Sequence, residues 1–278
     1  MATLRYVVAD VFTDRPLTGN QLAVFTDGRE VDDETMQRLA REMNFSETVF
    51  VLPPEEGGHA RIRIFTPATE LPFAGHPVLG SAFVLGAPLQ LGEIKLETGS
   101  GIVPVTLERD GARIVFGRMQ QPIPEWEPYA DAEELQEVLG VRSQLPVELY
   151  HLGPTHVYLE LASEEDVAQL EPDFGALKRF HAGINCFSGS GSRWKTRMFG
   201  PADGVPEDPA TGSAAGPLAI HLARHGRIAF ADEIEISQGD EIGRPSKLYA
   251  RVDGSADRIE RVEVGGSAVI IARGEFRL

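Results

Sequence analysis

A glutamate inside an apolar, strand-like segment is the first candidate for chemistry. Glu47 lies in segment 45–52, which is apolar at most of its other positions. Because side chains alternate between the two faces of a strand, Glu47 shares a face with Val49 and Val51. Such surroundings remove water from a carboxylate and raise its pKa toward neutrality, which suits a general acid/base. The alternative interpretation is a glutamate on an edge strand that faces water.

A histidine next to a glycine and a proline is the second candidate. In Gly75-His76-Pro77 the glycine lets the backbone approach a ligand closely, and proline is favoured in the first turn of a helix. We therefore expect His76 at or beside a helix N-terminus, where unpaired amides and the helix dipole attract anions. A histidine that only caps the helix, without a ligand, is an equally acceptable interpretation of this pattern.

A third polar group lies in segment 207–213. Pro209 favours an extended backbone at the preceding Asp208. Gly212 and Ser213 would then open another helix, with its first amides close to the Asp208 carboxylate. An ordinary turn followed by a helix cap explains the same residues without any ligand.

An internal repeat relates the second and third groups. Segments 63–68 and 197–202 are identical at four of six positions, and each leads through a proline-containing loop into an apolar helix. Segments 78–85 and 214–222 are apolar on nearly all sides, which is typical of buried helices. The sequence therefore predicts two similar lobes, each a sheet wrapped around one central helix, with the active site in the cleft between them.

The lobe boundary is expected at 118–125, where Gln120-Gln121-Pro122-Ile123-Pro124 is typical of a linker. This gives an N-terminal lobe at 1–120, with a C-terminal strand at about 267–278 as a candidate addition, and a C-terminal lobe at 121–278. A helix should begin after Asp32 or Asp33 and end near Asn44. The serine- and glycine-rich segment 188–192 is expected to be a flexible loop.

Composition narrows the functional classes. The chain has 278 residues and a net charge of −16, so nucleic acid and anionic membranes are unfavourable partners. Its single cysteine, Cys186, permits no intramolecular disulfide. The first residues do not resemble a signal peptide, and no apolar run reaches about 18 residues, so we expect a cytoplasmic protein. His221 and His225 are four apart but lack the glutamate of a HExxH motif, and no metal is expected.

These groups together resemble the PhzF family, which has the α/β (α+β) fold of diaminopimelate epimerase. The resemblance extends over the whole chain. The broad family pattern is matched at 19–20, 43–47, 73–77 and 207–216. Segments 120–124, 150–154 and 217–226 are similar to the phenazine-biosynthesis branch of that family.

The resemblance implies an isomerase that shifts a proton on trans-2,3-dihydro-3-hydroxyanthranilate and yields a reactive ketone. Glu47 would be the acid/base, and His76 and Asp208 would bind and polarise the substrate. Further substrate-binding residues implied by the resemblance are Asn20, Gly75, Gly212 and Ser213. It also implies a small-molecule substrate, no metal, flavin or nucleotide cofactor, and a homodimer.

Three alternatives compete with this assignment. An amino-acid epimerase of the same fold would use two cysteines at the helix starts, where this chain has Ala74 and Thr211. An isomerase of another small cyclic acid would keep the same acid/base. A protein that only binds a metabolite would not require Glu47.

Overall fold

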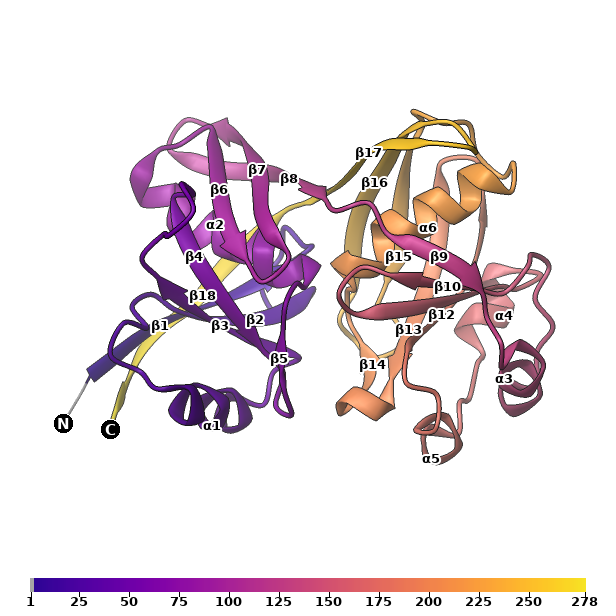
Figure 1. Cartoon of the computed structure of the whole chain (residues 1–278), viewed down its shortest axis with the longest axis horizontal. Coiled ribbons are helices and arrows are strands. Elements are labelled where there is room, and N and C mark those ends of the chain that lie inside the picture. The colour runs from indigo at the N-terminus through magenta and orange to yellow at the C-terminus, as the bar shows by residue number, and fades with distance from the viewer. Residues whose placement is uncertain (1–2) are drawn as a thin grey trace. The chain divides into compact units, whose positions relative to one another are not determined.

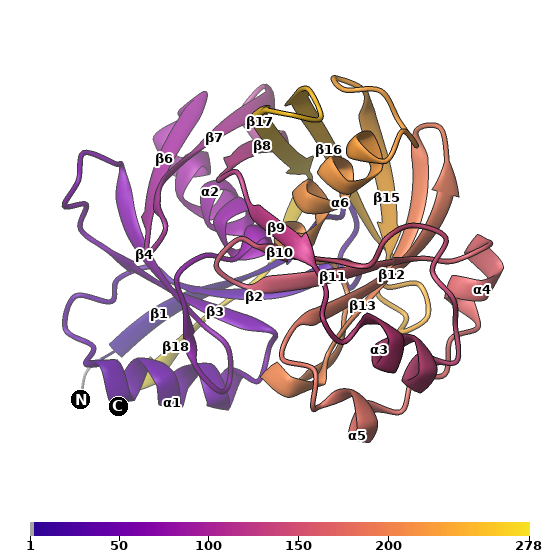
Figure 2. The same cartoon turned by 45° about the vertical axis from the view of Figure 1, so that its right-hand side comes forward.

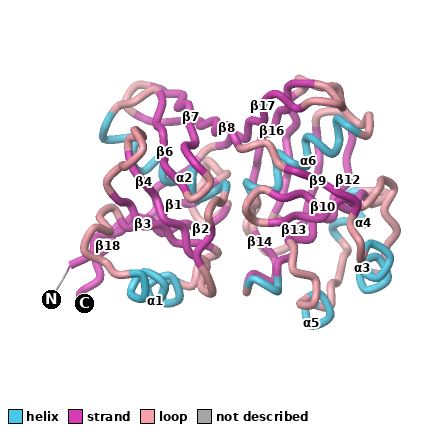
Figure 3. Tube along the Cα trace, viewed as in Figure 1, coloured by secondary structure: helices cyan, strands magenta, loops and turns pink. Residues whose placement is uncertain are grey.

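The computed structural model describes residues 3–278, which divide into two compact units. The N-terminal unit comprises residues 3–120 and 265–278, and the C-terminal unit comprises residues 121–264. Strands predominate over helices in both units (Figure 3). Met1 and Ala2 lie outside the described residues. They belong to the N-terminal segment that is not expected to be a signal peptide. Within 3–278, no helix combines the length and the hydropathy needed to cross a bilayer.

The N-terminal unit is a curved sheet with one helix inside it and a second helix beside it (Figures 1 and 2). Its elements are β1 (Thr3–Val11), β2 (Asn20–Phe25), α1 (Asp33–Met43), β3 (Glu47–Leu52), β4 (Ala60–Phe65), β5 (Glu70–Leu71), α2 (Gly75–Leu89), β6 (Glu93–Thr98), β7 (Gly101–Asp110), β8 (Arg113–Gln121) and β18 (Ala268–Arg277).

The two helices of this unit follow from their sequences. Asp32 caps α1 by accepting a hydrogen bond from the Thr35 amide at 2.8 Å, and Asn44 ends it in the left-handed conformation, as expected. One face of α1 packs against an aromatic cluster on the sheet that includes Phe25 and Phe50. Helix α2 is buried at every residue from 75 to 84, so the strands must enclose it.

The C-terminal unit has the same design. Its elements are β9 (Glu125–Pro128), α3 (Ala132–Leu139), β10 (Glu148–His151), β11 (Thr155–Glu160), α4 (Glu164–Ala168), α5 (Phe174–Leu177), β12 (Gly183–Ser190), β13 (Arg193–Gly200), the 3₁₀ turn η1 (Pro201–Asp203), β14 (Val205–Asp208), α6 (Gly212–Arg224), β15 (Glu233–Gln238), β16 (Ser246–Gly254) and β17 (Ile259–Gly266). Helix α6 is buried from 212 to 223 and packs beside β16 (Figure 1).

The two units pair their strands in the same order. The order is β18–β1–β2–β3–β4–β6–β7 in the N-terminal unit. It is β9–β10–β11–β12–β13–β15–β16 in the C-terminal unit. In each series the third and fifth pairings are parallel and the rest antiparallel. The prediction of two similar lobes, each with a sheet around a central helix, is confirmed for each unit.

An arginine–glutamate pair recurs in this duplicated arrangement. Arg63 on β4 makes two hydrogen bonds of 2.7 Å to Glu70 on β5. Arg197 on β13 makes hydrogen bonds of 2.9 and 2.8 Å to Glu207 on β14. In both units the pair joins the short strand that precedes the central helix to the neighbouring longer strand.

Two local expectations were wrong. Gln120 and Gln121 belong to β8, and only residues 122–124 separate β8 from β9, so the linker is shorter than predicted. Segment 188–192 is not a flexible loop. Its first three residues pair with β13 in a hairpin, and the side chain of Trp194 on β13 is buried. Small residues permit this close pairing, because a Cβ at Gly189 would lie 2.3 Å from the Arg193 carbonyl oxygen.

The repeated ion pairs give a matched test of stability. The side chains of Arg197 and Glu207 are each 7% exposed, whereas those of Arg63 and Glu70 are 22% and 42% exposed. Glu207→Gln leaves a buried guanidinium without its anion and should lower the free energy of unfolding by about 3–5 kcal/mol. Glu70→Gln should lower it by about 1 kcal/mol or less. Urea denaturation of both variants checks this, and equal losses would contradict it.

Candidate functional site

Glu47 and His76 lie side by side in the N-terminal unit. Glu47 is the first residue of β3, and His76 is the second residue of α2. Oε2 of Glu47 lies 3.4 Å from Nε2 of His76. The Glu47 side chain is 15% exposed, and β3 is paired on both sides by β2 and β4. The alternative of a solvated edge-strand glutamate is therefore wrong.

Asn20 orients the His76 ring. The Ser46 hydroxyl donates to Oδ1 of Asn20 at 3.3 Å, which turns the amide nitrogen toward His76. This Nδ2 lies 3.2 Å from Nδ1 of His76. The donor and acceptor roles in this contact depend on the tautomer of the ring, and Nε2 is the ring atom that faces Glu47. Ser46, Asn20 and His76 thus form a series of polar contacts that ends 3.4 Å from the Glu47 carboxyl group.

His76 is neutral in this setting. Burial lowers the pKa of His76 from 6.5 to about 3, against a smaller opposing effect of a hydrogen bond with the Gln21 backbone. The contact with Glu47 is therefore between a carboxylate and a neutral imidazole, not an ion pair. The raised pKa expected for Glu47 stays a prediction.

The Asp208 carboxylate is hydrogen-bonded within the C-terminal unit. Asp208 is the last residue of β14 and is 4% exposed. The Thr211 hydroxyl donates to its Oδ2 at 2.7 Å. Gln238 on β15 donates to the Asp208 carbonyl at 2.8 Å and accepts from the Thr211 amide at 3.2 Å. These bonds fix the turn between β14 and α6.

Gly212 and Ser213 open α6, as the sequence predicted. The carbonyl of Gly212 accepts a hydrogen bond of 2.7 Å from Nε2 of Gln121, which is buried. Oγ of Ser213 lies 2.9 Å from Nε2 of His156. The first amides of a helix have no carbonyl partner within it, so this end of α6 offers donors to an anion.

The seven predicted site residues thus fall into two groups, each gathered within one unit. Asn20, Glu47, Gly75 and His76 meet at the start of α2, and Asp208, Gly212 and Ser213 meet at the start of α6.

Sequence reasoning missed three residues that support the second group: Gln121, His156 and Gln238. Gln121 was assigned to a linker because prolines follow it. His156 lies in an apolar strand, and burial lowers its pKa to about 4. Only the repeated pattern of the two units could have directed attention to the strand that carries His156.

Among residues 3–278, Glu148, His221 and His225 form the cluster that most resembles a metal site. Oε2 of Glu148 lies 3.1 Å from Nδ1 of His221 and 3.2 Å from Nε2 of His225. The same oxygen also accepts from the Arg224 guanidinium at 2.7 Å and the Tyr150 hydroxyl at 2.9 Å. Burial would raise the pKa of Glu148, but these hydrogen bonds outweigh it and lower the pKa. The Arg224 guanidinium supplies the positive charge that a metal ion would supply, so these residues form a hydrogen-bonded network.

Cys186 is packed in the core of the C-terminal unit and is 0% exposed. Burial raises the pKa of its thiol to about 12. The thiol is therefore protonated at neutral pH and unsuited to acid/base exchange.

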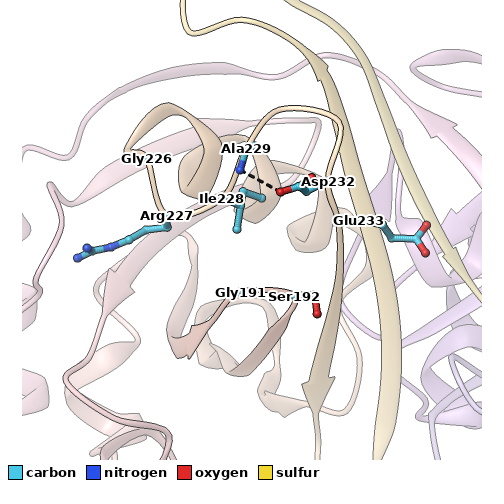
Figure 4. A pocket seen from close by; sticks show the side chains of 8 residues that line it. All are labelled: Gly191, Ser192, Gly226, Arg227, Ile228, Ala229, Asp232 and Glu233. Carbon is cyan, nitrogen blue, oxygen red and sulfur yellow. Dashed lines mark hydrogen bonds between the residues drawn. The ribbon is translucent and has the colours of Figure 1, made fainter.

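An open pocket of about 660 Å³ lies at the β12–β13 turn and the segment after α6 (Figure 4). Gly191 and Ser192 line one side, and residues 226–229, 232 and 233 line the other. The Ala229 amide donates to the Asp232 carboxylate there at 3.3 Å. None of the predicted site residues lines this pocket.

Comparison with known proteins gives consistent matches. The family model described as "Phenazine biosynthesis-like protein" (PhzC-PhzF) matches residues 9–274. A trans-2,3-dihydro-3-hydroxyanthranilate isomerase of Pseudomonas aeruginosa is 53% identical over 276 residues, 99% of each chain.

Two solved structures support the same fold. The PhzF-family phenazine biosynthesis protein of Bacillus anthracis aligns over 100% of both chains, with a TM-score of 0.86 and 25% identity. A probable proline racemase of Agrobacterium radiobacter K84 aligns over 99% of this chain and 93% of its own, with a TM-score of 0.70 and 12% identity. The second likeness concerns the fold alone, which is the expected epimerase-like fold.

The buried histidines predict how stability depends on pH. The pKa values of His76 and His156, about 3 and 4, lie below the ordinary 6.5, so the unfolded chain binds protons that the folded chain does not. The free energy of unfolding should therefore fall as pH decreases below 6.5, by about 1.4 kcal/mol per pH unit for each histidine.

This prediction can be checked by NMR and by denaturation. Imidazole signals of His76 and His156 should remain those of neutral rings at pH 5. Urea denaturation gives the free energy of unfolding at each pH between 6.5 and 4.5. Its slope with pH should be smaller in His156→Gln than in the wild type by the equivalent of about one bound proton. Titration of either ring near pH 6.5 would contradict the prediction.

Proposed function

Because the chain belongs to the PhzC-PhzF family of phenazine biosynthesis-like proteins, we propose that it is a trans-2,3-dihydro-3-hydroxyanthranilate isomerase. Relatives of that name are 52–53% identical to it over nearly their whole length. The observation that carries the mechanism is the largely buried Glu47 carboxylate beside the neutral His76 ring.

Glu47 acts as both base and acid. Its carboxylate removes the proton from the hydroxyl-bearing carbon, and the electron pair of that C–H bond shifts through the conjugated diene. The protonated carboxyl then returns the proton to another carbon of the diene. The product is an enol that becomes the reactive ketone, and two such ketones condense toward the phenazine precursor. No atom is gained or lost in the isomerisation.

His76 supports this proton transfer through Nε2. A neutral imidazole can donate a hydrogen bond to the carboxylate or to a polar group of the substrate without neutralising Glu47 by a positive charge. Asn20 contacts Nδ1 on the other side of the ring at 3.2 Å. Gly75 leaves the backbone at the start of α2 accessible to the substrate.

Asp208 and the start of α6 bind the polar groups of the substrate. The amides of Gly212 and Ser213 and the Ser213 hydroxyl are donors for the carboxylate of the substrate. Asp208, oriented by Thr211, accepts from the substrate amine or hydroxyl. Local donors of this kind let a chain of net charge −16 bind an anion. The proposed chemistry needs only acid/base groups and no cofactor.

Isotope exchange tests the assignment. The wild type, incubated with trans-2,3-dihydro-3-hydroxyanthranilate in D₂O without added cofactor, should consume it and place deuterium at the newly protonated carbon. Glu47→Gln should bind the substrate but react at least about a hundredfold more slowly. NMR and mass spectrometry follow both reactions.

Glu42→Gln, an exposed change on α1, is the matched control and should retain wild-type activity. Rapid turnover of a different cyclic acid, with only trace turnover of this one, would transfer the assignment to that acid. Binding without exchange into D₂O would indicate a protein that only binds a metabolite.

The proposal also includes a homodimer, as the family resemblance implies, and a location in the cytoplasm, as the sequence pattern predicts. Light scattering during size-exclusion chromatography should give about twice the 30.3 kDa mass of one chain. A mass of one chain at micromolar concentration would contradict the dimer.

A further inference from the structure

The duplicated fold gives Glu47 and His76 counterparts in the C-terminal unit. Gly75 opens α2 and Gly212 opens α6, so the second residue of each helix, His76 and Ser213, correspond. The start of α6 is therefore the counterpart of the site at the start of α2.

The strand register supplies the counterpart of Glu47. Phe65 and Phe199 occupy the same place in the internal repeat. Phe65 pairs with Thr48, and Phe199 pairs with Ile184. The residue before Thr48 is Glu47, and the residue before Ile184 is Gly183.

Gly183 has no side chain, and His156 fills the space. The two residues are paired across the parallel strands β11 and β12. A Cβ at Gly183 would lie 2.6 Å from Nδ1 of His156 and 3.1 Å from its Cε1. The imidazole therefore occupies the place where a side chain at the Glu47 position would begin, and its Nε2 reaches Ser213 at 2.9 Å. The pair Glu47 and His76 thus corresponds to the pair His156 and Ser213.

The direction of the hydrogen bond follows from Asn185. Its Nδ2 donates to the carbonyls of Gly183 at 2.9 Å and Val157 at 3.3 Å, so this end of the amide is the nitrogen. The same Nδ2 faces Nδ1 of His156 at 3.5 Å. An amide nitrogen cannot accept a hydrogen bond, so a proton on Nδ1 would face no acceptor there; Nε2 therefore carries the proton and donates to Oγ of Ser213. The Ser213 hydroxyl hydrogen must then point away from His156.

We propose that His156 is a positioning residue: by donating through Nε2 to Ser213, it directs the Ser213 hydroxyl hydrogen to the carboxylate of the substrate. This inference rests on the proposed function, because the substrate supplies that carboxylate. A hydroxyl that already accepts a hydrogen bond is a stronger donor to an anion. In the C-terminal unit, the place that corresponds to Glu47 is thus occupied by His156, which prepares the Ser213 hydroxyl as a donor.

A double-mutant cycle tests the coupling. Wild type, His156→Leu, Ser213→Ala and the double variant are compared by KM and kcat for the isomerisation and by the Kd for anthranilate, an unreactive ring with a carboxylate and an amine. Each single variant should raise KM and the anthranilate Kd roughly tenfold or more, because a hydrogen bond to a charged group is lost. The double variant should be no worse than either single one, and kcat should change less than KM.

Two further variants separate positioning from packing. Glutamine can present an N–H close to the place of Nε2, so His156→Gln should restore KM to within about threefold of the wild type. Gly183→Ala should displace the ring and reproduce the effect of His156→Leu on KM without changing His156 itself. His151→Gln, at an exposed histidine on the neighbouring strand β10, is the control and should leave KM unchanged.

The outcomes distinguish this inference from the proposed function. Additive losses in the double variant, or no effect of His156→Leu, would overturn the inference even if the wild type isomerises the substrate. A coupled cycle for anthranilate with no isomerisation by the wild type would support His156 and reject the proposed substrate. Failure of the wild type both to isomerise and to bind anthranilate would overturn both. If His156→Leu does not fold, Gly183→Ala replaces it in the cycle and is measured alone and together with Ser213→Ala.

Discussion

Both units depend on enclosing a helix that is apolar around its whole circumference. Strands must cover α2 and α6 on all sides, which leaves the helix ends as the places where backbone polar groups and ligands can meet. The N-terminal ends also carry the favourable dipole for an anion. The Arg63–Glu70 and Arg197–Glu207 pairs hold the short strands that lead into these ends. The packing that encloses each helix therefore also determines where its polar groups lie.

The same scaffold has given its two halves different chemistry. In the N-terminal unit the Glu47 carboxyl group lies beside a neutral ring. In the C-terminal unit the corresponding position is a glycine, and a neutral histidine from the next strand points at a hydroxyl. Burial keeps both His76 and His156 uncharged. The two units therefore present different polar groups at the starts of their central helices.

Local patterns predicted what local forces determine. The caps of α1, the buried character of α2 and α6, and the place of His76 in the first turn follow from neighbouring residues, and all are found. Gln121 was misassigned because the prolines after it indicate a linker, while its side chain reaches Gly212. His156 and Gln238 reach their partners at Ser213 and Thr211 across 57 and 27 residues. Such contacts depend on strand register, which a single sequence does not specify.

The strand β18 has a consequence for the order in which the chain can fold during synthesis. It lies beside β1 in the N-terminal unit, although more than 140 residues separate it from that unit's other strands. The C-terminal unit, by contrast, is one continuous segment. On the ribosome the later unit can therefore reach its final form first, while the earlier one waits with the long edge of β1 unpaired. During this interval β1 is exposed to pairing with other nascent chains, and a chaperone that shields it would act on the N-terminal unit.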